Sequence, residues 1–229
     1  MPATWKELYD TTLVGVYALL VLPVLFLARL ALRGFASSAG VEPYAARFVR
    51  MWTIAFALAS IADPIATGLL GWPLMPWVLL GDYRVFALVL IVMEPGRARA
   101  SALAEGVAWT VPVPLVALAT VRAMALVAGE PPGATLWIVY ETSFALLTLF
   151  LMARVVPRRV GIERALVRSY VRAVLGFVCA YYVLWVTSDV LVMTGHEWGW
   201  GLRVVPNLLY YGAFVPFAYF RFFREVTGP

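Results

Sequence analysis

The stretch TTLVGVYALLVLPVLFLARLAL, residues 11–32, decides the fold. Its first charged side chain is Arg29, so the residues before it are uncharged for most of the length that a membrane helix needs. A helix rises about 1.5 Å per residue, and about 20 mostly apolar residues cross the roughly 30 Å hydrocarbon core of a bilayer. The flank Trp5-Lys6-Glu7 is mixed in charge and the core is long, which argues against a cleaved signal peptide. We therefore expect a membrane span that stays in the protein.

Working outward, six further stretches have the same character, at residues 51–71, 75–93, 103–127, 135–155, 170–193 and 204–222. Turn-forming residues separate the spans: Gly34, Ser37, Ser38 and Gly40; Gly71 to Pro76; Pro95 and Gly96; Gly129 to Gly133; Pro157 to Gly161; and Gly195 to Gly201. Only 14% of the 229 residues are charged and 63% are hydrophobic, whereas about a quarter are charged in soluble domains. We predict an all-α, seven-helix transmembrane bundle that forms one domain over residues 1–229.

The orientation follows from the distribution of basic residues, which favour the cytoplasmic side. If the N-terminus lies outside, 14 of the 18 basic residues fall on the inner side: Arg29, Arg33, Arg47, Arg50, Arg97, Arg99, Arg154, Arg158, Arg159, Arg164, Arg168, Arg172, Arg221 and Arg224. The outer side receives Lys6, Arg122 and Arg203, and Arg84 lies within a span. We predict an external N-terminus and a cytoplasmic C-terminus. The Ala- and Arg-rich composition suggests the inner membrane of a bacterium as the location.

A faint internal repeat accompanies this plan. Val16-Tyr17 recurs as Val139-Tyr140, and Asp63 recurs as Asp189, at nearly constant offsets. A parallel 3+1+3 repeat would explain the offsets, and general similarity among apolar helices is the alternative. Rhodopsin-like proteins and PQ-loop transporters share this topology, yet no residue motif of either group occurs in the chain.

Several chemistries are excluded by single residues. The only lysine, Lys6, lies outside the membrane, so no retinal Schiff base can form in the seventh span. One cysteine, Cys179, and one histidine, His196, rule out an internal disulfide and a histidine or cysteine zinc cage. The formal charge of +5 is interpreted as a topology signal and as attraction to anionic lipid. Nucleic acid is not expected as a partner, because no soluble module presents the arginines.

Five ionisable residues fall within the spans, where each costs about 2.5–3.5 kcal/mol on insertion scales. They are Asp63, Asp82, Arg84, Glu141 and Asp189. Counted along the helices at about 1.5 Å per residue, the four carboxylates lie roughly 18–25 Å from the inner face. They therefore form one charged layer in the outer half of the bilayer. Asp82 and Arg84 point apart on one helix, so Arg84 is expected to pair with Asp63, Glu141 or Asp189.

Polar groups at the same depth are expected to support this layer, notably Tyr140, Ser188, Asn207 and Tyr211. Pro64 removes a backbone N–H and frees a carbonyl beside Asp63. Four acids against one arginine leave a deficit of positive charge, which a proton or a cation would fill. No loop has the acidic spacing of a specific calcium or magnesium site, so the metal stays undefined and no cofactor is expected beyond a bound cation.

These residues favour transport or conduction of a small cation or proton through an outward-facing acidic cavity. The alternative is a non-transporting membrane subunit or receptor-like protein, in which buried ion pairs only hold the bundle together. A lipid-modifying enzyme is less favoured, because no serine has a histidine partner. The basic segment 157–172 is interpreted as an orientation determinant and lipid anchor, with docking of a cytoplasmic protein as the alternative reading.

Overall fold

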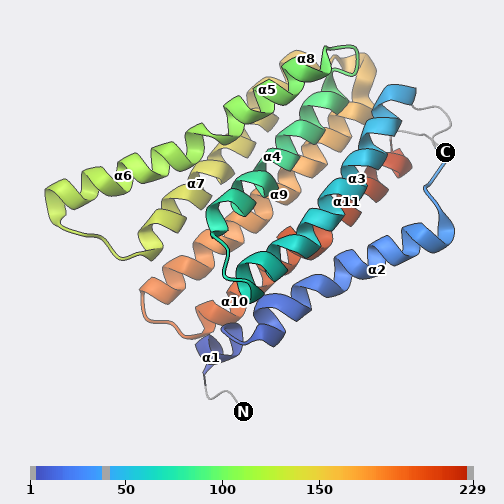
Figure 1. Cartoon of the computed structure of the whole chain (residues 1–229). Helices are drawn as coiled ribbons and strands as arrows, with labels where there is room; N and C mark the ends of the chain where they lie inside the picture. The colour runs from blue at the N-terminus through green and yellow to red at the C-terminus, as the bar shows by residue number, and fades with distance from the viewer. Residues whose placement is uncertain (1–3, 38–41, 226–229) are drawn as a thin grey trace.

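The computed structural model describes residues 4–37 and 42–225, so the expected breaks at Ser38 and Gly40 lie outside the described residues. Helix accounts for 87% of the described part of the chain, which contains no strand. The long helices run side by side in one bundle (Figure 1). Helices α1 and α10 lie at one end of it, called the α1 end, and α5 and α8 lie at the other, called the α8 end.

The helices join into eight segments within the described ranges, interrupted only by π-helical turns, a short 3₁₀ start and a one-residue turn at Val111. The segments are α1 (Trp5–Tyr9); η1 and α2 (Leu13–Tyr17, Ala18–Arg33); α3 and η2 (Pro43–Pro64, Ile65–Leu69); α4 (Leu74–Met93); α5 and α6 (Arg99–Thr110, Pro112–Ala128); α7, η3 and α8 (Ala134–Phe150, Leu151–Val155, Val156–Arg159); η4 and α9 (Ile162–Arg164, Ala165–Met193); and α10, η5 and α11 (Trp198–Asn207, Leu208–Ala213, Phe214–Glu225).

Six of these segments are long and apolar enough to cross a bilayer: Leu13–Arg33, Pro43–Leu69, Leu74–Met93, Arg99–Ala128, Ala134–Arg159 and Ile162–Met193. The fold is thus compatible with an integral membrane protein that has several spans. The last segment, from Trp198 to Glu225, also has sufficient length. Prolines, Asn207 and several tyrosines lower its hydropathy, and it is not among the six. The seven-span count, the orientation and the repeat therefore stay predictions.

The helices extend further than the sequence indicated at most boundaries. The predicted break from Gly195 to Gly201 is wrong in its second half, because α10 begins at Trp198. Similarly, α4 begins at Leu74, inside the predicted Gly71 to Pro76 break, and α8 contains Pro157. Apolar length marks only the part of a helix that needs lipid, whereas polar turns at either end prolong the helix without adding hydropathy.

Helix α4 lies at the centre of the bundle. Every residue from Val85 to Met93 is buried, and the carboxyl end of α4 packs within the main apolar core. By contrast, α6 lies at the edge of the bundle in Figure 1 and exposes Leu115, Leu126 and Val127. An apolar surface of this kind fits contact with lipid. Asp82 and Arg84, near the middle of α4, are therefore held inside the bundle and away from lipid.

Candidate functional site

A cavity of about 220 Å³ lies toward the α1 end of the bundle. It is called the aromatic cavity here, because seven tyrosine and tryptophan rings line it. Its lining residues are Tyr9, Gly15, Leu19, Leu74, Val78, Trp137, Tyr140, Glu141, Tyr182, Trp185, Arg203, Asn207, Tyr210 and Tyr211. They come from α1, η1, α2, α4, α7, α9, α10 and η5, so the cavity is a common meeting point of the bundle.

Glu141 brings a carboxylate to this cavity from α7. The residue is only 4% exposed, and its Oε2 atom accepts no hydrogen bond from the described residues. Asp189 and Arg203 are close enough to interact with it electrostatically. A buried carboxylate oxygen without a donor is costly, and such groups usually have a partner. Glu141 therefore has capacity for one more positively charged or hydrogen-bonding group.

Asp189 is held by an arginine that the sequence reading assigned to the outer side. Nη1 of Arg203 lies 3.0 Å from Oδ1 of Asp189, and the Arg203 side chain is 20% exposed. Arg203 lies in the second turn of α10, which places it on a helix packed against α9. Among the described residues, Arg203 thus joins Arg84 as a second arginine of the charged layer, although its side chain is partly exposed.

Asp82 is held by hydrogen bonds rather than by an ion pair. The hydroxyl groups of Tyr140 and Tyr182 both donate hydrogen bonds to its carboxylate, one to each oxygen. Tyr140 comes from α7 and Tyr182 from α9, so the three residues link three helices, and the two tyrosines also line the aromatic cavity. Sequence reasoning identified Tyr140 but missed Tyr182, which follows Tyr181 in a run of aromatic residues with no distinguishing signal.

Asp63 lies apart from these groups, beside a second cavity of about 10 Å³, which is close to the smallest volume that can hold one water molecule. Tyr211 hydrogen-bonds to the Asp63 carboxylate, and Thr67 is 3.4 Å from its Oδ1 atom. Pro64 is followed directly by the π-helical turn Ile65–Leu69. Because a proline leaves a carbonyl of the preceding turn unpaired, this segment departs from regular α-helix where the carboxylate lies.

Arg84 does not form the ion pair that the sequence predicted, since it has no carboxylate within 4 Å among the described residues. Its guanidinium donates instead to Ser60 Oγ at 2.8 Å and to the Tyr210 carbonyl at 2.6 Å. It also lies 4.4 Å from the ring centroid of Tyr210. Uncharged acceptors and an aromatic face therefore hold this cation. The prediction failed because it considered only carboxylates as partners.

Tyr210 and Tyr211 line both cavities, and so they separate Asp63 from the aromatic cavity. Both lie in the π-helical segment η5, which begins two residues after Pro206. Tyr210 packs against α4 so closely that a Cβ at Gly81 would lie 1.6 Å from its hydroxyl oxygen. Glycine at position 81 is therefore required for this approach. In the sequence, Pro206 followed by Tyr210 and Tyr211 is the pattern that corresponds to this separation of the two cavities.

The other two supporting residues behave differently from each other. The Asn207 amide accepts from Trp185 Nε1 at 2.8 Å and donates to the Tyr9 hydroxyl at 3.1 Å, so it joins α1, α9 and α10 at the cavity. Ser188 is fully buried but donates to the Trp185 carbonyl of its own helix at 2.8 Å. The structure thus brings Asn207, Tyr140 and Tyr211 to the cavities, whereas Ser188 lines neither of them.

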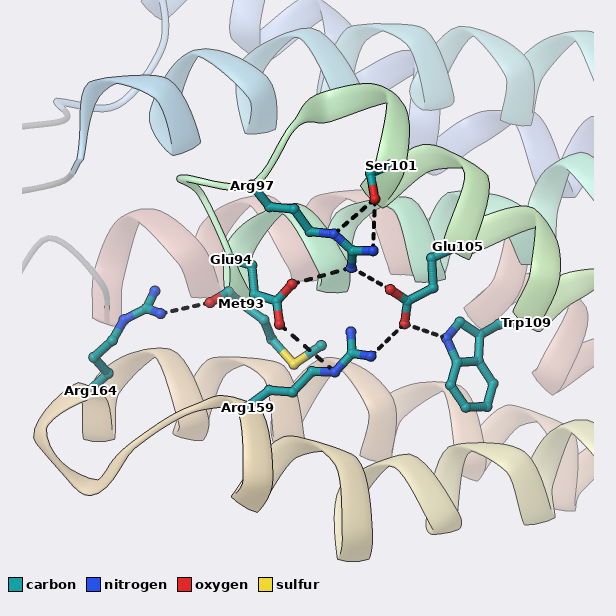
Figure 2. Close-up of polar contacts among 8 residues, drawn as sticks. All are labelled: Met93, Glu94, Arg97, Ser101, Glu105, Trp109, Arg159 and Arg164. Atoms are coloured by element: carbon teal, nitrogen blue, oxygen red, sulfur yellow. Dashed lines mark hydrogen bonds and ion pairs between the residues drawn. The ribbon is translucent and has the colours of Figure 1, made fainter.

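The α8 end carries a separate charged network (Figure 2). Arg97 bonds to Glu94 and Glu105, and Arg159 lies 2.8 Å from Glu105 and 3.8 Å from Glu94. The hydrogen bond to Glu105 raises the pKa of the Arg97 guanidinium above its ordinary value. These two acids and two arginines therefore connect α8 both to α5 and to the turn that follows α4.

Part of the basic segment 157–172 is engaged within the bundle. Besides Arg159, Arg164 donates to the Met93 carbonyl at 2.6 Å, and Arg168 donates to the Val160 carbonyl at 2.6 Å. These carbonyls lie at or beyond helix ends, where cations are favourable. Arg158 and Arg172 are exposed and remain accessible to lipid or to a partner.

Comparisons of the chain with protein-family models, with curated proteins and with solved structures found no match. Within the described residues, no group of three or more His, Cys, Asp or Glu side chains is placed to hold a metal ion. The geometry of the aromatic cavity is therefore the main guide to function.

Proposed function

We propose that the chain is a multi-pass membrane transport protein that binds a small cation or a proton in the aromatic cavity. In this proposal the segment Trp198–Glu225 is the seventh span, the α1 end faces outward, and the membrane is a bacterial inner membrane. The exposed apolar side chains of α6 then contact lipid. The arginine-rich α8 end faces the cytoplasm, as the positive-inside rule requires.

Glu141 carries the proposal. Its Oε2 atom has no hydrogen-bond partner in the described residues, although the residue lines the cavity and is only 4% exposed. A residue that served only to hold helices together would have its partner within the bundle. An ionisable group inside a span that faces a cavity is, by contrast, typical of a substrate or ion pathway.

The charge balance of the layer supports the same function. Asp63, Asp82, Glu141 and Asp189 face Arg84 and Arg203, which leaves a formal charge of −2 when every group is ionised. Low dielectric makes an uncompensated charge expensive in this environment. Binding of protons or cations would reduce the excess negative charge of the layer. The charged layer therefore favours positively charged solutes that reach the cavity.

Flux measurements with purified protein in liposomes test the proposal. An outside-acid gradient drives proton entry, reported by an entrapped pH dye, with and without small cations outside. We expect flux through the wild type, at least tenfold lower flux through Glu141→Gln, and unchanged flux through Glu130→Gln. Glu130 is exposed in the loop between α6 and α7 and serves as the matched control. Flux no greater than in empty vesicles for every cation would favour a non-transporting membrane subunit instead.

A further inference from the structure

The walls of the aromatic cavity are chemically uneven. Half of its fourteen lining residues are tyrosine or tryptophan, four are aliphatic residues or glycine, and three are Glu141, Arg203 and Asn207. Aromatic faces attract cations, and several rings around one small space are the usual means of binding alkylated ammonium groups. The composition of the wall is thus informative about which cation fits.

Some of these rings are already occupied by arginines of the protein. The guanidinium of Arg203 lies 5.9 Å from the Tyr9 ring centroid, and that of Arg84 lies 4.4 Å from the Tyr210 ring centroid. Among the described residues, no lysine or arginine lies over the rings of Trp137 or Trp185. Tryptophan is the strongest aromatic partner of a cation. Among the cavity rings that no described lysine or arginine covers, Trp137 and Trp185 are therefore the strongest partners for a cationic ligand.

The counter-ion is defined by elimination. Asp189 is paired with Arg203, and both oxygens of Asp82 accept tyrosine hydroxyls. Asp63 lies beside the second cavity, behind Tyr210 and Tyr211. Among the described residues, only Glu141 lines the aromatic cavity with a carboxylate oxygen that has no hydrogen-bond partner. The cavity therefore offers one negative charge to a ligand.

A bare inorganic cation fits this wall poorly. Hard cations such as Ca²⁺ and Mg²⁺ take six or more oxygen ligands in proteins. Here the Asn207 Oδ1 atom already accepts from Trp185, and the hydroxyls of Tyr140 and Tyr182 bond to Asp82. The volume, about 220 Å³, is also below the roughly 300–1,000 Å³ of sites for drug-sized ligands. These features favour a compact ligand with an apolar surface and a single charge.

We infer that the aromatic cavity binds a small organic monocation, an alkylated ammonium ion, between Trp137 and Trp185 with Glu141 as its counter-ion. This inference rests on the proposed function, because it names the class of solute that the same cavity accepts. Trp137 and Glu141 come from α7, and Trp185 comes from α9. Because α7 packs against α9, the ligand would contact both helices.

The test compares two molecules of nearly the same shape, the cation choline and the neutral 3,3-dimethylbutan-1-ol, in which a carbon replaces the charged nitrogen. Isothermal titration calorimetry of the full chain in detergent measures both, together with potassium chloride. We expect choline to bind at least tenfold more tightly than the alcohol and than potassium. Equal affinity for choline and the alcohol, or tighter binding of potassium, would overturn the inference without any variant.

Variants then assign the site. Glu141→Gln should weaken choline binding at least tenfold, and Trp137→Leu should weaken it at least threefold. Both variants should bind the alcohol within twofold of the wild-type affinity. The matched controls are Glu130→Gln and Trp72→Leu, which change an exposed acid and an exposed tryptophan outside the cavity. Both should bind choline as the wild type does. Loss of choline binding in the controls and in the cavity variants alike would contradict the assignment of the site.

The same measurements separate the inference from the proposed function. Charge-selective binding of choline without flux in liposomes would support the inference and remove the transport function. Flux of protons or potassium that Glu141→Gln abolishes, with no binding of choline to the wild type, would leave the transport function standing and overturn the inference.

Discussion

Arg203 lies 3.0 Å from Asp189, and the two residues come from adjacent helices, α10 and α9. The carboxylate is fully buried, whereas the arginine side chain is 20% exposed toward the α1 end. This pair links the second turn of α10 to the last turns of α9. Asp189 does not line the aromatic cavity, whereas Arg203 and Glu141 do, so Glu141 is the carboxylate that a ligand in the cavity would meet.

Removing one partner of this pair should destabilise the protein more than removing both, because a single removal leaves the other charge buried without compensation. Removing one partner of a buried pair costs about 3–5 kcal/mol, and the partial exposure of Arg203 should reduce this figure. We expect Arg203→Gln to lower the thermal unfolding temperature in detergent more than the double variant Asp189→Asn with Arg203→Gln. A double variant no more stable than the single one would show that Asp189 does not depend on Arg203.

Gly81 should be one of the least replaceable residues of α4. A Cβ atom there would lie 1.6 Å from the Tyr210 hydroxyl, so Gly81→Ala must displace the ring that separates the two cavities. Overpacking of this kind costs about 1–3 kcal/mol. We expect a lower unfolding temperature and weaker choline binding. Gly176→Ala is the control, because its Cβ would meet only Met152 Sδ, at 4.0 Å. Equal behaviour of the two variants would contradict the predicted packing.

The all-helical class followed directly from apolar length, because a chain in lipid must satisfy its backbone within each segment. Six apolar segments confirm that part. The helix ends did not follow, since polar turns such as Trp198 to Arg203 add no hydropathy although they continue the helix. The last segment illustrates the same limit, because its prolines and tyrosines, of which Pro206, Tyr210 and Tyr219 are buried, weaken the apolar signal that identifies a span.

The buried positions of Asp63, Asp82, Arg84, Glu141 and Asp189 match the expectation that such groups avoid lipid. Their partners were not predictable from depth along the helices alone. Depth along the helices assigns residues to one layer but does not say which way each side chain points. The rotation of α4 about its axis directs Asp82 to two tyrosines and Arg84 to Ser60. Arg203 was missed because the turn before α10 is shorter than its glycines suggested.

The network at the α8 end should contribute modestly to stability and should depend on salt. Arg159, Glu94 and Glu105 are 29%, 30% and 16% exposed, and ion pairs of this kind contribute about 1 kcal/mol or less. We expect Arg159→Gln to lower the unfolding temperature slightly at low ionic strength, with a smaller difference in concentrated salt. Arg158→Gln removes a neighbouring exposed charge and should have no effect. An effect of Arg159→Gln that grows with salt would contradict an electrostatic origin.

Orientation is the prediction that most directly connects the two ends of the bundle to the proposed function. A reporter inserted between Gly129 and Gly133, in the loop from α6 to α7, should be external, and a reporter fused after Pro229 should be cytoplasmic. The positive-inside rule places these sites on opposite sides, because fourteen of the basic residues then lie inside. Protease protection or enzymatic reporters in intact cells measure both. If both reporters lie on one side, an odd number of the three predicted spans after Gly133 does not cross the membrane, and if both are inverted, the aromatic cavity belongs to the cytoplasmic half of the bilayer.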